Sequence, residues 1–165
     1  MIILGIDPGY AILGYGIVSV NNNKVKPVDY GVIETASTEP FPQRLQKLYR
    51  GVNQLIEIYK PEQVAFEELF FARNVTTALS VGAGRGVAIL AAQQAGLPLY
   101  EYTPMQIKLA VTGSGRADKK QMQAMVKLLL ALKDIPKPDD AADALGVAIC
   151  HANTMNSFAE QFLIK

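Results

Sequence analysis

Three stretches near the start of the chain have the apolar character of β-strands. Residues 2–7 are apolar until the final Asp7, and residues 14–20 are rich in glycine, valine and isoleucine. Residues 25–35 alternate loosely, and Pro27 within them favours a sheet edge because proline donates no backbone hydrogen bond. Only short turns separate these stretches. The pattern therefore predicts three antiparallel strands.

The apolar period changes from strand to helix after residue 40. Apolar residues spaced three and four apart predict an amphipathic helix over residues 42–60, which Pro61 ends. They are Leu45, Leu48, Val52, Leu55, Ile56 and Tyr59. A fourth strand is expected at residues 63–67 and a fifth at 97–102.

A long segment between the last two strands, residues 74–95, predicts a helix rich in small side chains. Each glycine in a helix interior costs about 1 kcal/mol relative to alanine. Three of the five positions 82–86 are nevertheless glycine. Such a helix is expected to pack closely against another helix or a sheet.

The second half of the chain predicts mainly helices. They are expected at residues 104–112, 118–132 and 139–152. Three antiparallel strands followed by alternating helices and strands predict an α/β domain with a mixed five-stranded sheet over residues 1–155. Residues 156–165 have no clear period, and we expect a flexible C-terminal tail there.

Composition narrows the class of protein. Half of the 165 residues are apolar, which suffices for a sizeable core. A single cysteine, Cys150, excludes an internal disulfide and fits a reducing cytoplasm. No apolar run approaches the ~18 residues of a membrane span, and the N-terminus lacks a signal peptide's basic segment. We expect a soluble cytoplasmic protein. The net charge of +1 neither favours nor excludes nucleic acid as a partner.

Carboxylates stand at the ends of three predicted elements. The first strand ends in an aspartate, the fourth in glutamates, and the last helix opens with aspartates. They are Asp7, Glu67, Glu68, Asp139, Asp140 and Asp143. A buried carboxylate without a partner is unfavourable, so each acid requires a turn, a helix terminus or a cation.

The acids at the ends of the first and fourth strands each have alternative interpretations. Asp7 either accepts hydrogen bonds from the turn that follows it or holds a cation. On the fourth strand, alternation points Ala65 and Glu67 to one face and Glu68 to the other. The small Ala65 suits a face that something approaches, so Glu67 is the stronger candidate.

The last helix carries more acids than its first turn requires. Asp139 follows Pro138 and is a candidate N-cap, since acids in a first turn stabilise a helix. Asp140 and Asp143 are three positions apart and share a helix face. This pair is therefore a candidate for a second role.

If these carboxylates lay close together, bound cations would be needed to offset their mutual repulsion. Two of them 5 Å apart repel by ~3 kcal/mol at an effective dielectric of 20. All-oxygen ligands favour Mg²⁺ or Mn²⁺, whereas the lone His151 and Cys150 cannot form a zinc site. Two ions about 3.5–4 Å apart would clamp the attacking and leaving oxygens of a phosphodiester hydrolysis.

Four motifs in order resemble the RuvC family of Holliday junction resolvases. They are ILGIDPG, AFEELFFARN, GRGVAI and PDDAADALGVAI, and the likeness runs from residue 1 to about residue 153. The resemblance implies a ribonuclease H-like fold, a homodimer, and Mg²⁺-dependent paired cutting of two strands in a four-way DNA junction. It also implies work beside the RuvA and RuvB branch-migration proteins in recombination and repair.

The resemblance also implies the site residues. The family's four catalytic, metal-binding acids correspond to Asp7, Glu67, Asp140 and Asp143, and Lys108 and Lys119 match its lysines near the scissile phosphate. Phe70 matches a base-contacting aromatic, although a core phenylalanine is the ordinary alternative. Arg73 and Asn74 fit DNA contacts, and Arg116 and Lys120 add charge in GSGRADKK, which looks like a mobile phosphate-binding loop.

Three other functions compete with a junction resolvase. A nucleotide-binding domain of the sugar kinase and actin type has a similar first hairpin, but two such domains are needed to enclose ATP. A shorter YqgF-like resolvase shares the first motif without a match to EELFFARN. A nuclease-dead junction binder would have lost an acid, and no expected acid is missing here.

Overall fold

A computed structural model describes residues 1–69, 75–155 and 159–164 of the chain. The strands are β1 (Ile2–Asp7), β2 (Ile12–Asn21), β3 (Lys24–Glu34), β4 (Gln63–Glu67) and β5 (Leu99–Tyr102). The helices are α1 (Phe41–Tyr59), α2 (Val75–Gln94), α3 (Pro104–Thr112), α4 (Lys119–Leu129) and α5 (Asp139–Thr154), with a short 3₁₀ helix at Ala159–Phe162. Within the described residues, no helix is long and apolar enough to cross a membrane.

The five strands form one mixed sheet in the order β3-β2-β1-β4-β5. β1, β2 and β3 pair antiparallel, whereas β4 lies parallel to β1 and β5 parallel to β4. This confirms the predicted mixed sheet. Pro27 lies on the edge strand β3, beside a register shift between Ile17 and Val18 of β2, where a missing backbone donor is tolerated.

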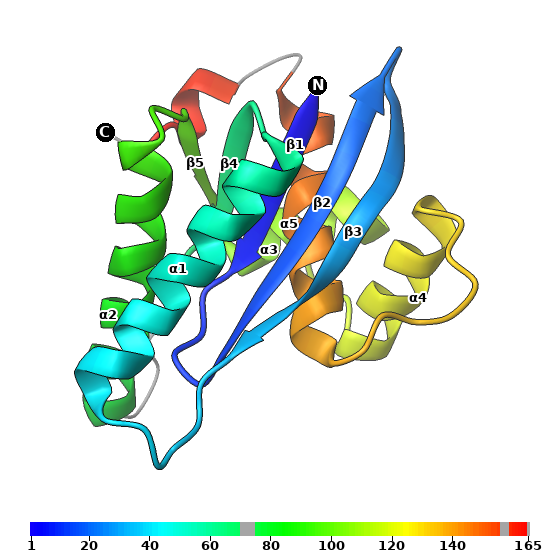
Figure 1. The fold of residues 1–165 in the computed structure, drawn as a ribbon. Helices are drawn as coiled ribbons and strands as arrows, with labels where there is room; N and C mark the ends of the chain where they lie inside the picture. The colour runs from blue at the N-terminus through cyan, green and yellow to red at the C-terminus, as the bar shows by residue number, and fades with distance from the viewer. Residues whose placement is uncertain (70–74, 156–158, 165) are drawn as a thin grey trace.

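Helices cover both faces of the sheet (Figure 1). α1 and α2 cover one face, where Leu48 and Val52 of α1 join the core with Leu4 and Ile6 of β1. α3, α4 and α5 lie on the other face. Every side chain of α5 from 141 to 152 except Asp143 is buried, so α5 is the central helix of that layer.

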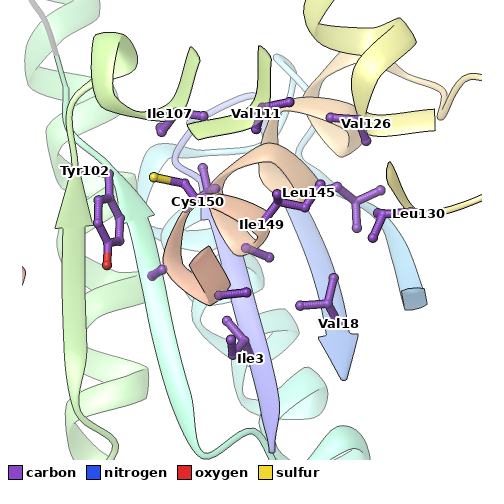
Figure 2. Close-up of a cluster of buried hydrophobic side chains, with 14 of the residues drawn as sticks. Ile3, Val18, Tyr102, Ile107, Val111, Val126, Leu130, Leu145, Ile149 and Cys150 are labelled. Carbon is purple, nitrogen blue, oxygen red and sulfur yellow. The ribbon is translucent and has the colours of Figure 1, made fainter. Parts of the chain in front are cut away.

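α5 lies unusually close to the sheet. A Cβ at Gly5 of β1 would lie 2.3 Å from the carbonyl oxygen of Ala144, so only glycine fits at this crossing. Figure 2 shows the core that results, in which side chains of α5 fill the space between the sheet and the helices α3 and α4. The labelled members are Ile3, Val18, Tyr102, Ile107, Val111, Val126, Leu130, Leu145, Ile149 and Cys150.

The described part of the C-terminal tail lies along β5. Leu163 forms an antiparallel bridge with Tyr100, and the Ile164 amide donates to the Leu99 carbonyl over 2.8 Å. The Phe162 ring lies 4.8 Å from that of Tyr102. The flexibility expected of residues 156–165 stays a prediction, and these contacts weigh against it for residues 159–164.

Candidate active site

Asp7 and Glu67 end two neighbouring parallel strands. The register pairs Ile6 of β1 with Phe66 of β4, so the two acids follow at adjacent positions on the same edge of the sheet. Ile3 and Ala65 both belong to the core beneath α5. Because side chains alternate along a strand, Asp7 and Glu67 also point toward the α5 face.

The start of α5 lies against the same edge. Gly14 of β2 pairs with Asp7, and a Cβ at Gly14 would lie 2.1 Å from the Asp140 carbonyl oxygen. This close approach places the first turn of α5 beside the end of β1. Asp143 follows Asp140 by three positions and therefore shares its side of the helix.

A cavity of about 460 Å³ opens where these elements meet. Asp7, Glu67 and Asp143 line it together with Lys108 of α3 and Lys119 of α4. Its remaining lining residues are Pro8, Glu68, Leu69, Pro104, Ile107 and Met122. Asp140 does not line this cavity, although its charge still raises the pKa of Asp7. The acids of the cavity therefore come from β1, β4 and α5, and its lysines from α3 and α4.

The two lysines are held there by capped helices. α3 begins with a capping box in which Thr103 accepts from the Gln106 amide over 3.2 Å and Gln106 accepts from the Thr103 amide. α4 begins with the same motif, in which Asp118 accepts from the Gln121 amide over 2.9 Å. These local hydrogen bonds fix where each helix starts and so where Lys108 and Lys119 lie.

The acids of the cavity hold protons more tightly than free carboxyls do. Burial, then the charges of Glu67, Asp143 and Asp140, raises the pKa of Asp7 to about 8. Burial, then Asp143, raises the pKa of Glu67 to about 7, although Lys108 and Lys119 oppose the shift. Burial also raises the pKa of Asp143. These shifts show carboxylates close enough to repel one another in a poorly hydrated space.

These acids are chemically suited to hard divalent cations. Carboxylate oxygens are the ligands that Mg²⁺ and Mn²⁺ prefer, and mutual repulsion favours a cation among them. Among the described residues, however, no group of three or more acidic, histidine or cysteine side chains is gathered tightly enough to hold a metal ion. The residue types therefore fit a metal, while the carboxylates would have to draw together to coordinate it.

Two expectations about the neighbouring acids are wrong. The N-cap of α5 is Pro138, with no side-chain cap hydrogen bond, so Asp139 is the first helical residue and does not cap the helix. Its carboxylate pairs with lysines instead. Glu68 lines the cavity with Glu67 because β4 ends at Glu67, and strand alternation does not extend beyond that end.

His151 and Cys150, which the sequence indicated could not form a zinc site, are core residues. His151 is fully buried, with Nδ1 2.7 Å from the Tyr102 hydroxyl and Nε2 2.7 Å from Oε1 of Gln63. Burial lowers the pKa of His151 to about 4, so the ring is neutral at physiological pH. Both ring nitrogens already have partners.

Comparison with known proteins assigns the family. The model of the family described as crossover junction endodeoxyribonuclease RuvC matches residues 3–151. The chain belongs to the RuvC family.

The RuvC relatives match along nearly the whole chain. Crossover junction endodeoxyribonuclease RuvC of Desulfitobacterium hafniense is 58% identical over 156 residues, 94% of either chain. The RuvC of Alkaliphilus oremlandii is 58% identical over 165 residues, the full length of both chains. The structure of Thermus thermophilus RuvC in complex with a Holliday junction substrate is 39% identical, covers 94% of each chain and superposes with a TM-score of 0.89. The predicted ribonuclease H-like fold is thus confirmed.

The resemblance to the RuvC family also predicted residues that contact DNA. The structure describes only some of these residues. Phe70, Arg73 and Asn74 lie outside the described residues, and their roles stay predictions. Arg116, between α3 and α4, and Lys120, in the first turn of α4, are exposed, and neither is among the residues that line the cavity.

Sequence reasoning missed Gln123 and Met122 of α4. Gln123 is a buried polar side chain that, after Lys119, contributes to lowering the pKa of Asp139, and Met122 lines the cavity. A signal for Gln123 was present, since it follows Lys119 by four positions and therefore lies on the same face of α4. Its partner Asp139, on a different helix, could not be inferred from that spacing.

Proposed function

We propose that this chain is a metal-dependent Holliday junction resolvase that makes paired, symmetric cuts as a homodimer. The observation that carries the proposal is the cavity that Asp7, Glu67 and Asp143 line together with Lys108 and Lys119. A nuclease of this kind requires acids to hold cations and bases to hold a phosphate. In a member of the RuvC family, four-way junction DNA is the substrate that this chemistry fits.

Each group in the cavity has a proposed role. Asp7, Glu67, Asp140 and Asp143 would hold two Mg²⁺ ions, for which Mn²⁺ would substitute. Bound there, such ions supply a nucleophilic water and stabilise the leaving oxygen. Lys108 and Lys119 orient the scissile phosphate and offset its charge, since Lys is a point-charge phosphate binder.

We assign contacts with the DNA backbone and with the junction centre to a second set of residues. Arg116 and Lys120 would contact backbone phosphates beyond the cut, because such contacts position a protein without reading sequence. Phe70 would stack on a base at the junction centre, flanked by Arg73 and Asn74.

The homodimer is proposed from the outer face of α2. Gly84 faces inward, where a Cβ would lie 3.3 Å from the Gly9 carbonyl oxygen, but a Cβ at Gly82 or Gly86 would meet nothing within 4 Å. Leu79 and Leu90, on the same stripe, are 71% and 49% exposed. The glycines at 82 and 86 therefore have no packing partner among the described residues, and a second copy of the chain would provide one. Ile89, next to Leu90 in sequence, is partly buried against the core.

A two-fold dimer suits the substrate. A four-way junction has approximate two-fold symmetry, and an isologous dimer presents two identical active sites to two equivalent strands. We propose RuvA and RuvB as further partners, and the cytoplasm as the place of action, on the strength of the family alone.

The proposal is tested by incubating the purified protein with a four-way junction labelled on each strand in turn. With Mg²⁺, we expect nicks at symmetric positions in two opposing strands, and none when the cation is chelated. A linear duplex of the same sequence serves as the control and should stay intact. Tight junction binding without cutting at any Mg²⁺ or Mn²⁺ concentration would identify an architectural binder and refute the nuclease proposal.

A further inference from the structure

Asp139 of α5 interacts with two residues of α4. Its Oδ2 lies 3.2 Å from Lys119 Nζ, and Lys119, followed by the Gln123 side chain, lowers the pKa of the Asp139 carboxyl. Lys119 and Gln123 are four positions apart on α4 and share one face. Lys137 Nζ approaches the other carboxylate oxygen at 3.5 Å. Asp139 therefore connects the start of α4 to the start of α5.

Lys119 is shared between Asp139 and a residue of the cavity. Its Nζ lies 3.5 Å from Oδ2 of Asp143, which lines the cavity, whereas Asp139 does not line it. Lys119 thus stands at the cavity's edge with one acid partner inside and one outside. Any cation that engages Asp143 would compete with Lys119 for that carboxylate, and Asp139 would remain as its partner.

Helix stability does not explain the position of Lys119. It is the first residue of α4, directly after the N-cap Asp118. A positive charge in the first turn is disfavoured by the helix dipole, and Lys120 adds a second one. The pair with Asp139 is exposed, and exposed ion pairs contribute little to stability. What the pair does is fix where the Lys119 ammonium lies.

We propose that Asp139 is a positioning residue for Lys119: from outside the cation site, it holds the Lys119 ammonium at the mouth of the cavity through each reaction cycle. The inference rests on the proposed nuclease function, in which Lys119 orients the scissile phosphate. Asp139 then acts through Lys119 and touches neither cation nor DNA.

The test is a double-mutant cycle on junction cutting under single-turnover conditions. Asp139→Asn should slow cutting by roughly 10- to 100-fold, the cost of a misplaced catalytic group. The junction Kd and the melting temperature should stay at parent values, and Asp139→Glu should recover much of the rate. In a Lys119→Met background, Asp139→Asn should have no further effect. Lys137→Met, which removes only the other lysine partner of Asp139, is the matched control and should cut like the parent.

A second measurement does not depend on junction cutting. In the protein without added divalent cations, limited acylation of lysine amines followed by mass spectrometry should find Lys119 less reactive than its neighbour Lys120. Asp139→Asn should bring the reactivity of Lys119 toward that of Lys120, and Lys137→Met should not.

Each remaining outcome overturns the proposal. A slower rate for Asp139→Asn in the Lys119→Met background, with a higher Mg²⁺ requirement, would make Asp139 a cation ligand. Unchanged Lys119 reactivity in Asp139→Asn, or a parent-like cutting rate, would leave the pair as a surface contact. If the parent itself fails to cut junctions, the proposed function fails, and the acylation result still decides whether Asp139 holds Lys119.

Discussion

Asp7 has the most strongly raised pKa of the acids in the cavity. Burial and three neighbouring carboxylates raise that pKa to about 8, a costly arrangement for a residue that only opens a turn. The end of β1 is fixed by pairing with β2 on one side and β4 on the other, so Asp7 cannot withdraw from its neighbours. We propose that Asp7 holds a cation, because a bound cation would offset this repulsion.

Asp7→Asn tests this role, because the amide keeps the shape of the side chain and removes its charge. We expect junction cutting to fall by orders of magnitude while the junction Kd stays near that of the parent. Asp134→Asn, at an exposed aspartate, is the matched control and should cut normally. Full cutting by Asp7→Asn would return Asp7 to the turn interpretation.

The raised pKa values of the acids predict an unusual dependence of stability on pH. From the ordinary carboxyl pKa of 3.8 up to about 8, the folded chain binds more protons at Asp7 than the unfolded chain does. The contribution of Asp7 to the free energy of unfolding is therefore full below pH 3.8 and is lost as pH rises through that window. Glu67 acts in the same direction up to about pH 7.

Thermal melts in a chelating buffer measure this dependence. Between about pH 6 and pH 8.5 the melting temperature of the parent should fall relative to that of Asp7→Asn. Added Mg²⁺ should restore the parent most strongly at the higher pH, because cations bind ionised carboxylates. Parallel pH profiles for the two proteins would contradict the assignment of the raised pKa to Asp7.

At the scale of elements, local signals predicted more than distant ones. β4 and α3 begin and end at the predicted residues, because Pro61 lies before one and the Thr103 capping box and Gly113 enclose the other. The acids of the site were found by the same local logic of strand ends and helix starts. The partner of Asp139 was missed because it comes from α4, about twenty residues away along the chain, and only the packing of α4 beside α5 brings it close.

The C-terminal segment shows the same limit. Residues 159–164 have no strong pattern of their own, and their structure depends on β5, to which they add a bridge at Tyr100. Phe162 packs against the ring of Tyr102 in the core, and the local sequence pattern does not predict this tertiary contact. An otherwise open sheet edge is covered in this way, which guards against edge-to-edge association.

A chain that lacks residues 159–165 should therefore be less stable. Loss of one large, partly buried apolar side chain costs about 2 kcal/mol and should lower the melting temperature by roughly 5 °C. Phe162→Ala should reproduce most of that loss, whereas Leu163→Ala, at a 40% exposed residue, is the matched control and should not. A truncated chain that melts like the parent would support a flexible tail instead.

At the scale of the whole molecule, the two faces of the sheet have different proposed roles. The face under α5 carries the acids and leads to the cavity, with α3 and α4 supplying its lysines. The opposite face is covered by α1 and α2 (Figure 1). The outer stripe of α2 carries Gly82, Gly86 and the exposed Leu79 and Leu90. The proposed function thus places cutting and association on separate surfaces, and we expect that one can be disturbed without the other.

Gly86→Leu tests that separation. A Cβ at Gly86 meets nothing within 4 Å, and leucine favours the helix over glycine by up to about 1 kcal/mol, so the single chain should fold at least as stably as the parent. A bulky side chain there should keep a second copy of α2 from approaching. By analytical ultracentrifugation at micromolar concentration, the parent should sediment as a dimer and Gly86→Leu as a monomer that makes unpaired nicks. Ala124→Leu, which adds the same side chain at an exposed position of α4, should stay dimeric. A monomeric parent that still makes paired cuts would refute the dimer, because one active site cannot reach two opposing strands in a single encounter.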